Sequence, residues 1–364
     1  MASTLKKKLR FAYEPDFVTE PGSILRETID SLGITQKELA ARTGYSPKHV
    51  NQLIGGKARI TPEAAFRLER VTRVPARFWN NLETQYRDRK ARLEANLTVA
   101  EDLLWMKTIP TRELIKRGFL PSNANPAETL AATLSFFGVA SVDAWKAGWS
   151  KHRIAFRKSD GADECSGGIA AWVRLAELQA AKLECATYHS ASFKAALDKI
   201  RRLTTVSPEK FVPEMRQICA AAGVALSLVP DIPGTKVSGA ARWLNNSNAM
   251  IALNLRGKRN DKFWFTFFHE AGHILNDSPD EVFVDVDYDE DPREQAANKF
   301  AKDLLISPSH ARELKTLKSK AAVRTYAQRI GIHAGIVVGR LQHEKIIPFS
   351  HMHELMERLD WKEA

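Results

Sequence analysis

The feature that most constrains this chain is a pair of histidines four residues apart, His269-Glu-Ala-Gly-His273, within an apolar stretch. Apolar residues at helical spacing surround the motif, and Asp261 offers an N-cap, so the pattern predicts a buried helix from about Asp261 to Asn276. Side chains four residues apart on a helix lie one above the other, about 6 Å apart along the axis. Both imidazoles can therefore reach one metal ion, with Glu270 beside the position that the ion leaves open.

An alternative is a pair of core histidines that hydrogen-bond to the backbone, with Glu270 exposed. Two buried imidazoles beside a glutamate are costly without a metal, so we favour the metal site. A catalytic zinc ion usually has three protein ligands and a water molecule in the fourth position. A third ligand must therefore come from elsewhere in the chain.

Residues 277–291 contain eight acids and offer several candidates for the third ligand, but we favour Glu294, which follows them. Glu294 shares a helical face with Ala297, Asn298 and Ala301, and a carboxylate on an inward face needs a cationic partner. However, Asp291-Pro-Arg-Glu294 also fits a capping box, with Asp291 as the cap. Spacing alone leaves both roles of Glu294 open.

The HExxH motif, followed by Glu294-Gln-Ala-Ala-Asn-Lys-Phe-Ala-Lys-Asp-Leu-Leu305, resembles the ImmA/IrrE family of metallopeptidases. The resemblance covers about residues 206–345 and includes Ser238-Gly-Ala upstream. It implies an α+β metallopeptidase fold in which His269, His273 and Glu294 bind zinc. Ser307-Pro308 departs from the Met-Pro of many family members.

Such a site would hydrolyse amide bonds. Zinc lowers the pKa of its bound water toward about 7, and Glu270 would accept the proton of the water and return it to the departing amine. Asn298 either orients a ligand by a hydrogen bond or is a surface amide. His333 and Tyr326 are candidates to stabilise the oxyanion.

Near the C-terminus, His351-Met-His353 is interpreted as a solvated helix start, because no nearby carboxylate has the spacing of a second metal site.

The N-terminal part predicts a series of short helices. Thr35-Gln-Lys-Glu38 has the form of a capping box, and Gly44 ends that helix. Ser46-Pro47 and Thr61-Pro62 each combine a capping hydroxyl with proline at the first helical position. The helices before and after Gly44 have the proportions of a helix-turn-helix, with Val50, Leu53 and Ile54 inward.

The remaining polar side chains of this motif and its flanks face outward and are predicted to contact DNA. Asn and Gln suit adenine, whereas Lys and Arg suit guanine or phosphate. A solvated helix surface is also rich in Lys and Gln, and this alternative stays open. The expected contacts are Gln36, Lys37, Ser46, Lys48, His49, Asn51, Gln52, Lys57 and Arg59.

Charge favours the same partner, because residues 1–100 contain 18 basic and 11 acidic residues, and the whole chain has a net charge of +11. The segments Ile34-Thr-Gln-Lys-Glu-Leu-Ala, Asn51-Gln-Leu-Ile-Gly-Gly-Lys57 and Pro75-Ala-Arg-Phe-Trp79 resemble the XRE-type domain of HigA-like antitoxin repressors. The similarity spans about residues 20–90. It implies a homodimer on palindromic, double-stranded operator DNA.

We therefore predict a multidomain protein: an all-α helix-turn-helix domain over 17–94, a helical middle over 95–205, an α+β metallopeptidase-like domain over 206–350 and a tail over 351–364. Within the third part, 223–229 reads as a strand, and 237–244 with 249–253 reads as a hairpin. Trp145, Trp172 and Phe193 are expected in the core, and Cys165, Cys185 and Cys219 are read as packing residues. No apolar run reaches the ~18–20 residues of a membrane span, which favours a cytoplasmic protein.

The resulting functional hypothesis is a transcription regulator that binds operator DNA and contains a zinc endopeptidase. Its expected substrate is an XRE-type repressor, namely itself, a twin subunit or a partner, cleaved in response to a signal. The alternative is a non-enzymatic repressor, or an antitoxin that masks a toxin partner, whose zinc fold is a sensor or scaffold. A digestive protease is disfavoured by the DNA module and by the lack of an export signal.

Overall fold

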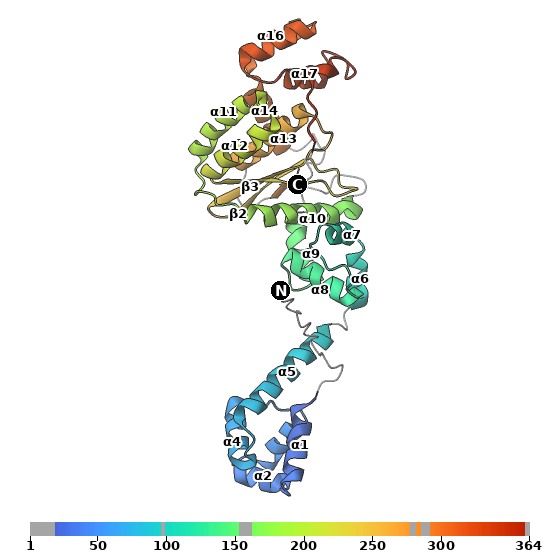
Figure 1. Ribbon diagram of the computed structural model, residues 1–364, viewed down its shortest axis with the longest axis vertical. Coiled ribbons are helices and arrows are strands. Elements are labelled where there is room, and N and C mark those ends of the chain that lie inside the picture. The colour runs from blue at the N-terminus through green and yellow to red at the C-terminus, as the bar shows by residue number, and fades with distance from the viewer. Residues whose placement is uncertain (1–18, 96–98, 153–161, 277–281, 285–291, 361–364) are drawn as a thin grey trace, which may run out of the picture. The chain divides into compact units, whose positions relative to one another are not determined.

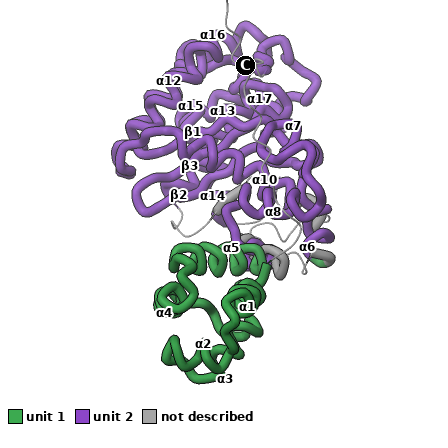
Figure 2. Tube along the Cα trace, turned by 60° about the horizontal axis from the view of Figure 1, so that its bottom comes forward, with its two compact units in different colours: residues 1–101 green, residues 102–364 purple. Residues whose placement is uncertain are grey.

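The computed structural model describes residues 19–95, 99–152, 162–276, 282–284 and 292–360. The chain divides into two compact units, residues 1–101 and 102–364, which Figure 2 colours separately. Among the described residues, no helix is both long enough and apolar enough to span a membrane.

In the described residues of the first unit, the regular secondary structure is helical. Its core consists of apolar side chains from all five helices, among them Leu25, Leu39, Leu53, Leu68 and Trp79, each at most 1% exposed. The helices are α1 (Pro21–Ser31), α2 (Gln36–Thr43), α3 (Pro47–Ile54), α4 (Pro62–Thr72) and α5 (Ala76–Ala95).

Local capping explains where these helices begin and end. The Thr35 hydroxyl accepts the backbone N–H of Glu38, and the Glu38 carboxylate accepts the backbone N–H of Thr35. Gly44 ends α2 with φ 71°, a backbone conformation that favours glycine. The hydroxyls of Ser46 and Thr61 cap α3 and α4 in the same way as that of Thr35 caps α2. The predicted helix-turn-helix geometry is confirmed.

The second unit consists of helices on both sides of a small sheet (Figure 1). Its strands are β1 (Val224–Leu228), β2 (Gly239–Asn245), β3 (Asn248–Leu253) and β4 (Val282–Val284). Its helices are α6 (Val99–Met106), α7 (Thr111–Lys116), α8 (Pro126–Phe137), α9 (Val142–His152), α10 (Ala162–Ala180), α11 (Ser190–Arg202), α12 (Pro208–Ala221), α13 (Asn260–Asn276), α14 (Pro292–Leu305), α15 (Pro308–Ala311), α16 (Lys320–Ile330) and α17 (Ala334–His343).

The sheet is mixed, with strand order β1-β3-β2-β4. β1 runs parallel to β3, whereas β2 is antiparallel to both of its neighbours. The predicted hairpin is present, because β2 and β3 pair across the turn between Asn245 and Asn248.

Both faces of the sheet are buried, which β3 shows most clearly. Ala249, Ile251 and Leu253 contribute to a core with α11 to α14, α16 and α17, whereas Met250 and Ala252 contribute to a second core with α6 to α10. Alternate side chains of a strand point to opposite faces, so an uninterrupted apolar strand needs cover on both sides.

From residue 102 onward, the described part of the helical middle region, expected over 95–205, belongs to the second unit. Helix α10 packs on the face of the sheet opposite α12 and α13, as Figure 1 shows. Trp172 donates its indole N–H to the carbonyl of Val229 at 3.1 Å, and Ser227 donates its hydroxyl to the carbonyl of Ala176 at 2.9 Å. The described parts of helices α6 to α10 and the sheet therefore share one core.

The aromatic and cysteine residues that were expected in the core are mostly buried. Trp145, Trp172 and Phe193 are buried as predicted, and Cys219 is buried whereas Cys185 is partly exposed. The side chain of Cys165, residues 1–18, most of the acidic stretch 277–291 and residues 361–364 lie outside the described part of the chain.

Candidate metal centre and nucleic-acid interface

Helix α13 holds the HExxH motif in the interior of the second unit. It packs against β2 and β3, and also against α14 and α17. His269, Glu270 and His273 are 3%, 0% and 2% exposed. The apolar residues around the motif explain this burial, because Trp264, Phe267 and other aromatic side chains of α13 are part of the hydrophobic core.

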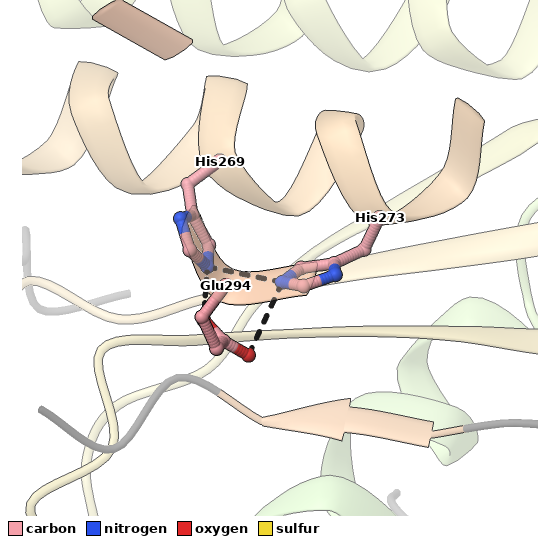
Figure 3. Close-up of side chains that lie close together, drawn as sticks. All are labelled: His269, His273 and Glu294. Carbon is pink, nitrogen blue, oxygen red and sulfur yellow. Dashed lines mark hydrogen bonds and ion pairs between the residues drawn. The ribbon is translucent and has the colours of Figure 1, made fainter. Parts of the chain in front are cut away.

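Glu294 of α14 reaches the two imidazoles, as Figure 3 shows. His269 Nε2 lies 3.1 Å from His273 Nε2 and 3.0 Å from Glu294 Oε2. The distance from His273 Nε2 to Glu294 Oε1 is 3.4 Å. The structure therefore brings together the three side chains that the sequence proposed as ligands.

These three side chains fit a divalent metal ion. A tetrahedral zinc ion with Zn–N and Zn–O bonds of about 2.0–2.1 Å holds its ligand atoms about 3.3 Å apart. The distances of 3.0–3.4 Å between the Nε2 and Oε atoms are close to that value. Among the described residues, His269, His273 and Glu294 form the cluster able to hold a metal, and neither His351 nor His353 belongs to it.

Asn298 contacts the nitrogen of His269 that does not face the other two side chains. Its Oδ1 lies 3.1 Å from His269 Nδ1. An amide oxygen only accepts hydrogen bonds, so this contact favours the His269 tautomer with the proton on Nδ1, which would leave the Nε2 lone pair for a metal ion. This is the arrangement in which a partner outside the ligand set orients a metal-binding histidine.

The electrostatics of Glu294 favour its ionised form. Burial raises its pKa, but hydrogen bonds from His269 and His273, together with their positive potential, outweigh burial and lower the pKa to about 2. Glu294 is therefore a carboxylate near neutral pH, as a metal ligand must be. The alternative for Glu294 was a capping box with Asp291 as the N-cap residue. Asp291 lies outside the described residues.

Glu270 lies against the start of β2. A Cβ atom added at Gly239 would lie 2.6 Å from Glu270 Oε1 and 2.6 Å from Thr266 Cγ2, so any side chain there would displace the Glu270 carboxylate or Thr266. Gly239 is the glycine of the Ser238-Gly-Ala segment, to which the sequence assigned no role at the site. The available signal was a glycine at the start of an otherwise apolar strand, which often marks a close approach of the backbone.

The two candidates for the oxyanion are placed elsewhere. The Tyr326 hydroxyl donates to the carbonyl of His310 at 2.8 Å. His333 caps α17, where its Nδ1 accepts from the backbone N–H of Gly335 at 3.0 Å and faces Asn260 Nδ2 at 2.7 Å. Neither residue lines the cavity beside His269.

In the first unit, the inward and outward sides of α3 are as expected. Val50, Leu53 and Ile54 are buried. His49 and Gln52 are partly exposed, and the ring of His49 packs edge-on against Tyr45 with 4.6 Å between centroids. The other expected DNA contacts are exposed: Gln36, Lys37, Ser46, Lys48, Asn51, Lys57 and Arg59.

Comparison with known proteins gives the same two parts. Residues 25–79 match the family described as "Helix-turn-helix", and residues 230–342 match the peptidase family described as "IrrE N-terminal-like domain". The "Uncharacterized HTH-type transcriptional regulator YddM" of Escherichia coli (strain K12) is 33% identical over 66 residues, which are 18% of this chain and 70% of that protein.

A solved structure, described as "an addiction module antidote protein of a HigA (higA) family from Coxiella burnetii", is 25% identical. The match covers 23% of this chain and 92% of that one, with a TM-score of 0.22.

Proposed function

Because the chain belongs to the XRE-type helix-turn-helix transcriptional regulators and contains an IrrE-like peptidase domain, we propose that it is an operator-binding regulator with zinc-dependent endopeptidase activity. Its substrate in this proposal is an XRE-type repressor: the chain itself, a twin subunit or a partner repressor.

The observation that carries the proposal is the meeting of Glu294 with both imidazoles of the HExxH motif. The three side chains come from two helices, and each offers one atom. Zinc held there would supply a Lewis acid that polarises the scissile carbonyl and makes water a nucleophile near neutral pH.

The side chains of the protein perform the proton transfers. Glu270 follows His269 on α13, and its carboxylate would accept a proton from water and deliver it to the nitrogen of the departing amine. Asn298 would keep His269 in the tautomer that exposes Nε2. Gly239 leaves room for the Glu270 carboxylate.

The first unit would bind the operator DNA. In the proposal, two copies of the chain bind a palindromic operator, with α3 in the major groove. Asn51 and Gln52 read bases, while Lys37, Lys57 and Arg59 contact phosphates. Exposure of Asn51 and of these three basic side chains supports this arrangement.

Substitution of Glu270 by Gln tests the peptidase. Zinc-loaded wild type and Glu270→Gln protein are incubated with purified XRE-type repressors, with and without operator DNA, and the products are analysed by mass spectrometry. We expect cleavage by the wild type alone, with equal zinc content and equal operator affinity in both proteins. The control Lys299→Gln changes an exposed residue of α14 and should cleave normally. Cleavage that persists in Glu270→Gln would refute the proposed role of this residue.

A further inference from the structure

A cavity of about 430 Å³ begins at His269 and continues along α13. Lys262, Phe265 and Thr266 line it together with His269, and their spacing of three and four residues places them on one face of the helix. Seven residues separate Lys262 from His269, which is about 10 Å along the helix axis. The lining of the cavity therefore runs about 10 Å along α13 from His269.

Two further helices form the other walls. Helix α14 contributes Asn298, the partner of His269, and Lys302 one turn later. Helix α17 contributes Ile336 and Arg340. The cavity is thus continuous with the proposed catalytic site but contains side chains that the proposed mechanism does not use.

The charge of the lining is strongly unbalanced. Arg259, Lys262, Lys302 and Arg340 face one carboxylate, that of Asp261. Asp261 is already bound by two nitrogens of Arg259, at 2.9 and 2.7 Å.

Two of these cations are available to a ligand. Arg340 pairs with Glu344, which does not line the cavity. Among the residues that the structure describes, neither Lys262 nor Lys302 has an ion-pair partner. A ligand with a negative charge would supply the missing partner.

The rest of the lining is apolar. Phe265, Leu305, Ile306 and Ile336 provide surface for a hydrocarbon chain beside the lysines. A glutamate side chain combines two methylene groups with a terminal carboxylate, and it matches both parts of this surface. A lysine side chain of the substrate would place its positive charge beside Lys262 and Lys302 and would be repelled.

We propose that this cavity is the specificity pocket of the peptidase and receives a glutamate side chain next to the scissile bond. This inference rests on the proposed function and specifies its substrate class as peptides with an acidic residue beside the cleaved bond. Lys262 and Lys302 bind the glutamate carboxylate, and the apolar wall packs against its methylene groups.

The size of the preference follows from the exposure of the lysines. Lys302 is half-buried and Lys262 is exposed, and an ion pair in such a setting contributes up to about 1 kcal/mol. We therefore expect each lysine to favour glutamate over glutamine by up to about fivefold in kcat/KM, because 1 kcal/mol corresponds to about a fivefold change.

The test uses the zinc-loaded full chain and a randomised peptide library in which otherwise identical sequences contain Glu, Gln or Lys at each position. Cleavage is measured for the wild type, and binding is measured separately with Glu270→Gln protein. The charge-reversed variant Lys262→Glu/Lys302→Glu is compared with Lys315→Glu, an exposed lysine outside the cavity. Lys302→Gln provides a milder variant if the double variant fails to fold.

We expect the wild type and Lys315→Glu to prefer Glu at one position beside the cleaved bond, and the double variant to prefer Lys there. Cleavage without preference among Glu, Gln and Lys would overturn the pocket but leave the peptidase function intact. Preferential binding of Glu peptides to the Glu270→Gln protein, without cleavage by the wild type, would support the pocket and contradict the peptidase. Tight binding of inorganic phosphate, with equal binding of all peptides, would overturn the proposal in favour of a free anion.

Discussion

At the scale of single residues, the site depends on which atom of each side chain faces the centre. The positions of His269 and His273 could be predicted, because the pitch of a helix fixes residues four apart. Asn298 was a candidate to orient a ligand, but the sequence left this role open beside that of a surface amide, because its contact with His269 depends on how α14 packs on α13. The close approach of Gly239 to Glu270 was not predicted, because the two residues are far apart in sequence.

Loss of the Asn298 amide oxygen should weaken metal binding. We expect Asn298→Ala to lower the zinc affinity about 10–100-fold, because His269 loses the acceptor that fixes its tautomer. Asn298→Asp keeps an acceptor and should restore most of the affinity. Competition with a chromophoric chelator measures the dissociation constants, and Lys299→Ala is the control. An unchanged affinity in Asn298→Ala would show that this hydrogen bond does not position His269.

At the scale of helices and strands, local signals predicted the starts of α2, α3 and α4 and the end of α2, because each capping contact joins residues at most four positions apart. The start of α13 was predicted less well. Asp261 was expected to cap this helix, but the helix begins at Asn260, and the Asp261 carboxylate binds the guanidinium of Arg259 instead. That ion pair competes with the capping role.

The cap of α17 predicts a pH dependence. Burial lowers the pKa of His333, although Glu357 acts in the opposite direction. The unfolded chain therefore takes up a proton below pH about 6.5 while the folded protein does not, and the free energy of unfolding falls as the pH falls, by at most about 1.4 kcal/mol per pH unit. Protonated Nδ1 could no longer accept from Gly335.

Urea unfolding at pH 7.5 and 5.5 checks this prediction. His333→Asn keeps an acceptor but does not titrate, so its loss of stability between the two pH values should be smaller than that of the wild type. The same loss in both proteins would exclude His333 as a source of the pH dependence.

At the scale of the whole molecule, the sequence predicted the two functional parts but not the place of the middle region. The uninterrupted apolar strand Ala249–Leu253 indicates burial on both faces, yet it does not say which helix supplies the second layer. Helix α10 does so through Trp172, whose indole N–H binds the carbonyl of Val229. Such a contact joins residues 57 positions apart and has no local signal.

Two compact units with separate cores predict separate responses to ligands. Zinc at 100 times its dissociation constant should stabilise the unit of residues 102–364 by about 2.7 kcal/mol, and operator DNA should stabilise the unit of residues 1–101 by mass action in the same way. Hydrogen exchange of the full chain, followed by peptide mapping, reports each unit separately. Equal protection of α2 and α3 by zinc would contradict independent units.

The most direct test of the central claim is the location of the metal by anomalous X-ray scattering at the zinc edge, from crystals of the zinc-loaded full chain. We predict one strong peak about 2.0–2.2 Å from His269 Nε2, His273 Nε2 and an Oε atom of Glu294. The absence of a peak at these three atoms, with zinc bound elsewhere or not at all, would contradict the account.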